Sequence, residues 1–198
     1  MKTTLFKIGE IPDPKKGFKP GFLVMREVGN FFKEAICKEL DKLEANTVLE
    51  IDFTDVRFMD ISCADEIVVK VLARLEAGEF PERFIVLSHI EEQHRENIGT
   101  ALIVRKKAII VKEEDGWSLL GELVDSHRKA LFKVMESKSI TSRKLQEKMG
   151  YKEINEASSK LVILYKRCLI AHFPYRKAVR GGGRQFEYLS LLHNEGGG

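Results

Sequence analysis

The sequence is poor in cysteine and proline and contains no long apolar run. Its 198 residues include three cysteines, Cys37, Cys63 and Cys168, which lie far apart and are odd in number, so they argue against a disulfide framework. No apolar run approaches the roughly 20 residues that span a bilayer, and the N-terminal residues lack the apolar core of a signal peptide. We therefore expect a protein of a reducing, cytoplasmic compartment that does not enter a membrane.

The sequence also lacks the residue spacings of metal and catalytic sites. It has no C-x-x-C pair, and His89 and His94 do not have the i, i+4 spacing that places two metal ligands on one helix face. No motif joins either histidine to Cys63 as the base of a nucleophile, so a small buried thiol is the simpler interpretation of Cys63. We expect no metal, no cofactor and no enzymatic activity.

What the sequence does contain is abundant charge, unevenly distributed. Charged residues make up 32% of the chain and hydrophobic residues 43%, as in folded soluble domains. Residues 1–126 hold 18 Lys and Arg against 24 Asp and Glu, a net charge of −6, whereas residues 127–198 hold 15 against 6, a net charge of +9. This asymmetry predicts two parts with different roles, of which the basic part faces a polyanion. Two differently solvated surfaces would also produce it, and that alternative stays open.

The N-terminal part alternates between apolar runs of strand type and segments with helical spacing. Three of the five prolines fall in the first twenty residues, which we expect to form an extended lead-in ending in a short strand near residues 21–25. Beyond it, the pattern predicts helices over residues 27–43, 62–75 and 90–103, alternating with strands over residues 48–53, 83–88 and 107–111. This alternation predicts an α/β domain, residues 1–123, in which helices back a largely parallel sheet.

The C-terminal part has a different order of predicted elements. Residues 124–137 have helical spacing. The next segment, SITSRKLQEKMG, offers Ser139 or Thr141 as a helix N-cap and Gly150 as a C-terminal stop. A third helix is predicted over residues 155–170.

Two β-prone runs follow the third helix and flank the glycines at positions 181–183, which predicts a hairpin with a glycine tip. A helix, a helix–turn–helix and a hairpin, in that order, are the elements of a winged helix-turn-helix. We therefore expect an α+β domain of this kind over residues 124–198.

The helix–turn–helix segment resembles the common bacterial winged-helix sequence. There, a helix ending L-A-E-x-L-G precedes a helix of the form T-V-S-R-x-L-x-x-L and the residues x-x-x-G-L-I; here the corresponding stretches read KLQEKMG, EASSKLVIL and YKRCLI. Cys168 replaces the usual glycine. Val162 and Ile163 occupy places often filled by polar residues, which predicts either deeper burial of this helix or a contact within a homodimer.

The resemblance implies binding of double-stranded DNA, with the last helix in the major groove. Small or polar residues at the start of that helix can reach base edges, and arginines beside the glycine tip suit phosphates or a minor groove. The candidate DNA-binding residues are Arg143, Lys144, Ser158, Ser159, Lys160, Arg176, Lys177, Arg180 and Arg184. The alternative is a winged helix that contacts only protein.

Within the N-terminal part, VLEIDFTDVRFMDISCADEI resembles the STAS domain of sulfate transporters and anti-sigma-factor antagonists. In that family, V-x-L-D-L-S-G-V-x-F-M-D-S-S-G places a phosphorylatable serine at the start of a helix. Asp60 and Ser62 fit the pattern, whereas Ile61 replaces its first serine, and Asp55 and Cys63 replace its two glycines.

The sequence is still more similar to a bacterial STAS-like family whose members carry R-x-x-G before a helix and S-F-A-D-E after the next strand. Arg26 and Gly29 match the first motif, and SCADE at residues 62–66 matches the second. The likeness covers roughly residues 20–112. It implies a sheet of four to five strands backed by helices, and a non-enzymatic role in protein–protein signalling.

The same resemblance implies a kinase-like, ATP-binding protein as partner, with Ser62, next to Asp60, as a phosphorylation switch. A local role competes with the switch, because a serine at a helix start can cap it by accepting from the backbone N–H of Asp65 or Glu66. A helix N-terminus also stabilises a phosphate group, whereas the nearby carboxylates oppose one. Both roles of Ser62 stay open.

We expect the chain to be a transcription regulator in which the STAS-like domain receives a signal and the winged helix binds DNA. The alternative is a signalling adaptor of the anti-sigma-antagonist type whose winged helix binds protein.

Overall fold

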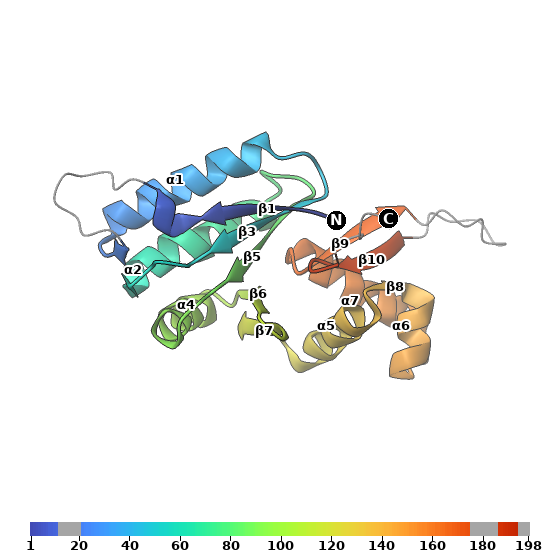
Figure 1. The fold of residues 1–198 in the computed structure, drawn as a ribbon. Coiled ribbons are helices and arrows are strands. Elements are labelled where there is room, and N and C mark those ends of the chain that lie inside the picture. Colours follow the sequence, from blue (N-terminus) through green and yellow to red (C-terminus); the bar gives the residue numbers. More distant parts are fainter. Residues whose placement is uncertain (12–20, 175–185, 194–198) are drawn as a thin grey trace. The chain divides into compact units, whose positions relative to one another are not determined.

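The computed structural model describes residues 1–11, 21–174 and 186–193, and the chain divides into two compact units (Figure 1). The first unit is Met1–Glu122 and the second is Leu123–Gly198. The first unit contains 18 Lys and Arg and 23 Asp and Glu, and the second contains 15 and 7. Their net charges are therefore −5 and +8, so the charge asymmetry of the sequence follows the division of the fold.

The first unit is built on a five-stranded sheet with the order β1-β3-β5-β6-β7. Its strands are β1 (Lys2–Lys7), β3 (Thr47–Asp52), β5 (Arg83–Ser88), β6 (Ala108–Glu113) and β7 (Gly116–Gly121). The first four are parallel, and β7 returns antiparallel to β6. The predicted α/β sheet backed by helices is confirmed, with one antiparallel strand at its edge.

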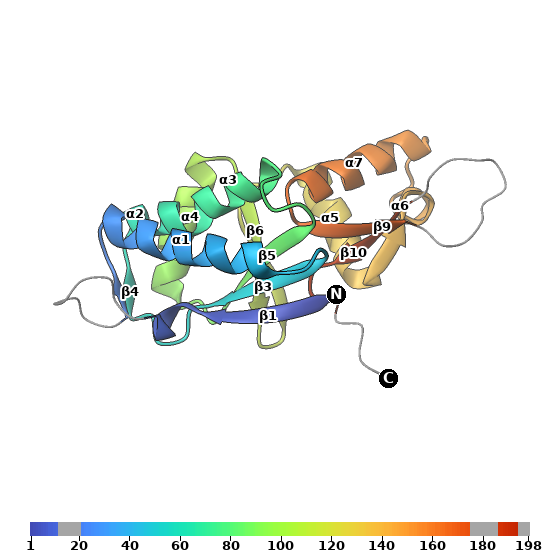
Figure 2. The same cartoon turned by 90° about the horizontal axis from the view of Figure 1, so that it is seen from above.

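Helical segments connect the parallel strands. They are α1 (Arg26–Lys42), the continuous segment α2 (Ile61–Ala64), η2 (Asp65–Lys70) and α3 (Val71–Glu76), and α4 (Glu92–Val104). Each crossover moves one strand along the sheet in the same direction, so right-handed connections place all the helices on one face. Figure 2 shows them on one side of the strands.

A small parallel pair of strands lies beside the main sheet and sets the position of the α2 start. It consists of β2 (Phe22–Leu23) and β4 (Phe58–Met59), which precede α1 and α2 respectively. The backbone N–H of Asp60 donates to the carbonyl of Leu23 at 3.0 Å. The starts of two helices that are distant in sequence therefore meet.

The second unit packs three helices against a three-stranded antiparallel sheet. The helices are α5 (Asp125–Ser137), α6 (Ser142–Met149) and α7 (Ile154–Lys166), and the strands are β8 (Ser139–Thr141), β9 (Ile170–Pro174) and β10 (Phe186–Ser190). The sheet order is β8-β10-β9. The core contains apolar side chains from all three helices, among them Leu131, Leu145 and Leu161.

The turn between α6 and α7 forms from local signals. The Thr141 hydroxyl caps α6 by accepting from the Lys144 N–H at 3.4 Å, and Gly150 ends the helix in the left-handed conformation with φ of 68°. Both residues perform the roles predicted from sequence. Ser139, the other N-cap candidate, lies in β8 and donates to Glu187 instead.

Three features of the fold differ from the sequence expectations. Residues 2–7 form the edge strand β1 rather than part of an extended lead-in, because their backbone pairs with β3. The third helix of the second unit ends at Lys166, and Ile170 already belongs to β9. The three-residue strand β8 was not expected, since so short a segment shows no period and becomes a strand only by pairing with β10. The glycines at 181–183 lie outside the described residues.

Candidate functional sites

The start of α2 contains the two residues expected to form a switch, and Asp60 organises it. Its carboxylate accepts hydrogen bonds from the Cys63 N–H at 2.7 Å, the Ser62 hydroxyl at 2.8 Å and the Met25 N–H at 2.8 Å. Burial by itself would raise the pKa of Asp60, but the hydrogen bonds from Met25, Cys63 and Ser62 outweigh it and lower that pKa. The carboxylate is therefore charged and fully engaged within the protein.

Asp60 is the N-cap of α2, and the expectation that Ser62 caps this helix is wrong. Ser62 lies within the first turn, where its hydroxyl donates to Asp60. The Asp65 N–H bonds to the carbonyls of Ile61 and Ser62 rather than to a side chain. Asp60 displaces Ser62 from the capping role because the first turn begins one residue earlier than predicted.

The two motifs that suggested a STAS-like domain contact each other. Arg26 approaches Glu66 at 3.6 Å and Asp65 at 4.0 Å. Gly29 faces the same helix so closely that a Cβ atom would lie 2.9 Å from Cys63 Cα and 2.9 Å from Glu66 Cβ. Arginine and glycine at this spacing therefore dock α1 onto the SCADE segment.

Glu66 is the buried centre of this contact. It is 2% exposed and is paired with Lys33 at 3.4 Å, with Lys70 and with Arg26. Burial acts to raise the pKa of Glu66, but the hydrogen bond and charge of Lys70 and the charge of Lys33 lower it. Glu66 is thus a buried carboxylate paired with cations from α1 and from its own helix.

Cys63 has the environment of a structural thiol. It is fully buried, its sulfur donates to the Met25 carbonyl at 3.0 Å, and burial together with the Asp60 charge raises its pKa to about 12. A thiol with so high a pKa is a poor nucleophile at neutral pH. His89 contacts Asp52 at 2.9 Å, so it is engaged elsewhere.

A hollow in the first unit lies at the carboxyl ends of β3, β5 and β6. It has a volume of about 760 Å³, and its lining includes Thr54, His89 and Lys112. Asp52 is hydrogen-bonded to two residues of this lining: burial would raise the pKa of Asp52, but the hydrogen bonds from Thr54 and His89 lower it. Sequence reasoning missed this hollow, although the ends of parallel strands are a common ligand position in α/β folds.

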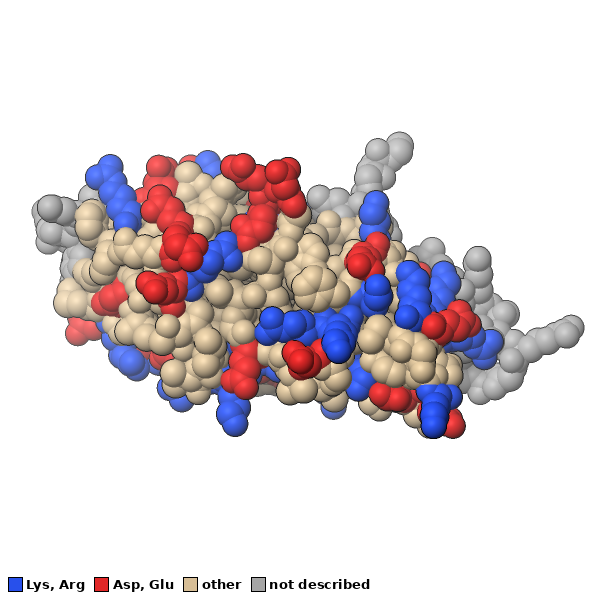
Figure 3. Space-filling view, turned by 90° about the horizontal axis from the view of Figure 1, so that it is seen from below, with Lys and Arg blue, Asp and Glu red and all other residues tan. Residues whose placement is uncertain are grey.

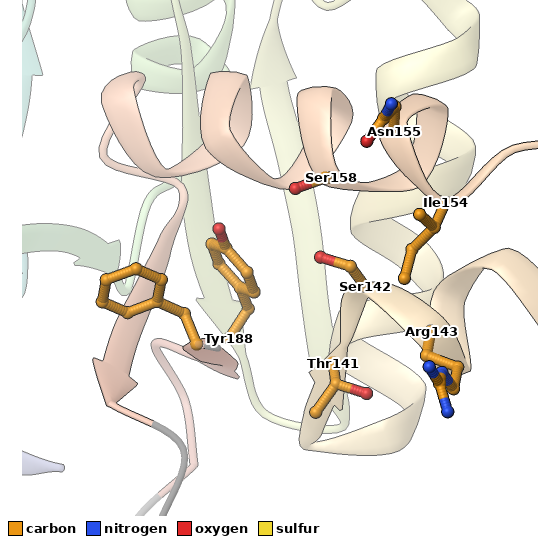
Figure 4. Close-up of a pocket in the computed structure, with 8 residues that line it drawn as sticks. Thr141, Ser142, Arg143, Ile154, Asn155, Ser158 and Tyr188 are labelled. Carbon is orange, nitrogen blue, oxygen red and sulfur yellow. The ribbon is translucent and has the colours of Figure 1, made fainter. Parts of the chain in front are cut away.

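The second unit presents a smaller pocket where α6 and α7 begin. Its volume is about 200 Å³, and it is lined by residues of both helix starts and of β10. Figure 4 shows the hydroxyl oxygens of Ser142, Ser158 and Tyr188 turned toward the same space. Arg143 and Asn155 also line the pocket.

Of the candidate DNA-binding residues, Arg143 and Ser158 line this pocket. Arg143 and Lys144 are exposed in the first turn of α6, and Ser158, Ser159 and Lys160 lie in the first half of α7. On the face shown in Figure 3, lysine and arginine side chains gather over the second unit.

Apart from the exposed Lys144, the other candidate DNA-binding residues are engaged within the protein or lie outside the described residues. Lys160 pairs with Glu156 at 3.6 Å, and Ser159 donates to the Asn155 carbonyl at 2.8 Å. Arg176, Lys177, Arg180 and Arg184 lie outside the described residues.

Three apolar residues of α7 are exposed: Ile154 at the start of the helix, and two residues in its second half. Val162 is 37% exposed and Ile163 is 39% exposed. The deeper burial of this helix, one of the two expectations from sequence, is therefore wrong for these side chains. The other expectation, a contact with a second molecule, stays a prediction.

Comparison with known proteins gives no relative from which a function could be transferred. No family model, curated protein or solved structure matches this chain. Within the described residues, no three His, Cys, Asp or Glu side chains are grouped in a way that could hold a metal ion. No described helix is long and apolar enough to cross a membrane. The function must therefore be argued from the two units themselves.

Proposed function

We propose that the chain is a cytoplasmic transcription regulator whose second unit is a winged helix-turn-helix that binds double-stranded DNA. The order helix, strand, helix, helix, hairpin and the sheet order β8-β10-β9 support this fold. The net charge of the second unit supports a polyanionic partner.

One observation carries the DNA hypothesis: the start of α6 exposes two cations that no carboxylate of the described residues neutralises. Within the described residues, Arg143 and Lys144 have no ion-pair partner, whereas Lys133 of α5 pairs with Glu136 at 2.9 Å and Lys160 with Glu156. Cations free of internal partners can neutralise phosphates without first losing an ion pair.

A salt series tests this function. Binding of the full chain to a labelled pool of random duplexes should weaken steeply as salt rises. Arg143→Ala should weaken binding and reduce the slope of log affinity against log salt by about 1, the value for one lost phosphate contact. Lys133→Ala, the matched control, should change neither. Absence of binding even at low salt would contradict the proposal.

The first unit, in this proposal, is a STAS-like domain that receives a signal from a protein partner, which the resemblance suggests is kinase-like. Met25 and Ile61 flank Asp60 and are 50% and 46% exposed, so an apolar surface is available beside the motif. If Ser62 is a switch, Ser62→Asp must change the DNA affinity of the full chain relative to Ser62→Ala. Equal affinities of the two variants would leave Ser62 with only its local role.

The exposed Val162 and Ile163 favour a second candidate function, an adaptor whose second unit binds protein, either a partner or a second copy of the chain. Exposed apolar side chains on the helix that would enter the groove suit a protein surface better than DNA. In that case the double variant Val162→Ser, Ile163→Ser would no longer associate with the protein partner. Neither this variant nor the unaltered chain would bind DNA.

A further inference from the structure

The pocket at the starts of α6 and α7 contains polar groups that the described protein leaves unused. Within the described residues, the hydroxyls of Ser142, Ser158 and Tyr188 have no hydrogen-bond partner. Tyr188 is the most informative of them, because its side chain is 3% exposed and its oxygen turns into the pocket (Figure 4). The hydroxyl oxygen itself is not sealed from solvent, so the pocket leaves it open to a ligand or to water.

Burial also fixes the state of the Tyr188 phenol. Burial, with a smaller effect of Tyr165, raises the pKa of Tyr188 above its ordinary value. The phenol therefore keeps its proton at neutral pH and can donate it in a hydrogen bond. Serine hydroxyls rotate freely and can donate as well.

Two helix N-termini meet at the same pocket. Ser142 and Arg143 are the first residues of α6, and Ile154 and Asn155 are the first residues of α7. The N-cap of α7 makes no side-chain hydrogen bond, so the first-turn N–H groups there have no side-chain acceptor. The uncapped N–H groups at the start of α7 and the dipoles of both helices favour a negative charge.

The side chains that line the pocket also favour a negatively charged ligand. They include the Arg143 guanidinium, and none of the described lining residues carries a carboxylate. The pocket volume of about 200 Å³ is below the roughly 300 Å³ at which drug-sized ligand pockets begin, so the pocket suits one small group.

We propose that this pocket binds a single phosphate group, held by the hydroxyls of Ser142, Ser158 and Tyr188 and by the Arg143 guanidinium. The group belongs either to the DNA backbone or to a free phosphate or small phosphate ester. The DNA source rests on the proposed function, whereas affinity for free phosphate does not.

The first test uses inorganic phosphate and the full chain labelled with ¹⁵N. Phosphate should shift the amide signals of Ser142 and Asn155 in a saturable manner, relative to chloride at the same ionic strength. Tyr188→Phe keeps the buried ring and removes only the hydroxyl, so it should weaken phosphate binding roughly tenfold. Ser158→Ala should act in the same direction and covers the case in which Tyr188→Phe fails to fold.

The matched control is Ser126→Ala. Ser126 lies in the first turn of α5, another helix start of the second unit, but it does not line the pocket. This variant should bind phosphate as the unaltered chain does. The proposal is overturned if phosphate gives no saturable shift in the millimolar range, or if Ser126→Ala loses as much affinity as Ser158→Ala.

Duplex binding by the same variants identifies the source of the phosphate. If Tyr188→Phe weakens DNA and phosphate binding together, the group is a backbone phosphate; if only phosphate binding falls, the site takes a free phosphate ester. If phosphate binds saturably and no DNA binds, the phosphate site is supported and the proposed function is contradicted. If DNA binds equally to Tyr188→Phe and to the unaltered chain, and phosphate does not bind saturably, the proposed function is supported and the phosphate site is contradicted.

Discussion

The two units place similar polar residues at helix starts and use them in opposite ways. At the start of α2, Asp60, Ser62 and Cys63 are bonded to one another or to Met25. At the starts of α6 and α7, the hydroxyls of Ser142 and Ser158 have no internal partner within the described residues. The first arrangement satisfies the protein itself, and the second leaves donors for a ligand.

This difference shows which residues of a motif are informative about function. A serine and an aspartate next to a helix fit a signalling motif, yet their hydrogen bonds account for them without any partner molecule. Polar groups without internal partners require another explanation, and Tyr188 is such a group because its ring is buried while its hydroxyl reaches the pocket. The comparison predicts that substitutions at the α2 start lower the stability of the first unit, whereas substitutions in the pocket of the second unit lower the affinity for a ligand.

The largest effect is expected where α1 docks on the SCADE segment. Gly29→Leu would place its Cβ 2.9 Å from the backbone at Cys63. Backbone cannot yield as a flexible side chain can, so the unfolding free energy of the first unit should fall by about 3 kcal/mol or more. Trp117, the only tryptophan of the chain, lies in β7, so its fluorescence during urea unfolding reports on this unit.

Asn30→Leu is the matched control, because it adds the same side chain at the next, exposed position of α1. It should change the unfolding free energy by less than about 0.5 kcal/mol. Similar losses in both variants would mean that the close approach of Gly29 to α2 does not determine stability.

The next largest effect on stability distinguishes the role of Asp60 from that of Ser62. Asp60→Ala leaves the N–H groups of Met25 and Cys63 without their acceptor, so we expect a loss of about 2 kcal/mol. Ser62→Ala removes one donor from a carboxylate that retains two others, and should cost less than about 1 kcal/mol. An equal or larger cost for Ser62→Ala would restore serine as the cap.

A pH titration should give an intermediate effect, also in the first unit. His94 of α4 is buried, and burial lowers its pKa although Glu91 and the Arg57 backbone act in the other direction. As the pH falls below 6.5, the unfolded chain binds a proton at this histidine more readily than the folded chain does. The first unit should therefore lose stability between pH 6.5 and pH 5.5, by at most about 1 kcal/mol.

The variant His94→Leu should flatten this slope when urea unfolding is followed at Trp117. Carboxylates with lowered pKa values, such as Asp60 and Glu66, lose their contribution only as the pH falls below about 4, so the two windows separate. An unchanged slope between pH 6.5 and pH 5.5 in the variant would assign the loss to other groups.

Sequence reasoning worked where a structure depends on neighbouring residues. The periodicity of α1, the Thr141 cap and the Gly150 stop are local, and each was predicted. The strand β8 and the cap at Asp60 depend on distant residues. Asp60 rather than Ser62 organises the α2 start because Met25, 35 residues away, is brought to it through the β2–β4 pair.

The candidate site of the second unit shows the same limit. Ser158 and Arg143 were predicted from their place in a helix–turn–helix pattern. Tyr188 was not, since only the pairing of β10 with β8, with Tyr188 opposite Ile140, brings it beside the α6 start. The resemblance suggested surfaces at the helix starts, and packing determined which of their polar groups have no internal partner.

The smallest effect on stability is expected in the pocket of the second unit. Tyr188→Phe retains the ring packing and removes a hydroxyl that has no partner in the described protein, so the stability of the second unit should change by less than about 0.5 kcal/mol. Backbone amide hydrogen exchange in α7 measures this unit separately from Trp117. If Tyr188→Phe were as costly as Asp60→Ala, its hydroxyl would be part of the folding of the second unit, and the contrast between the two units would fail.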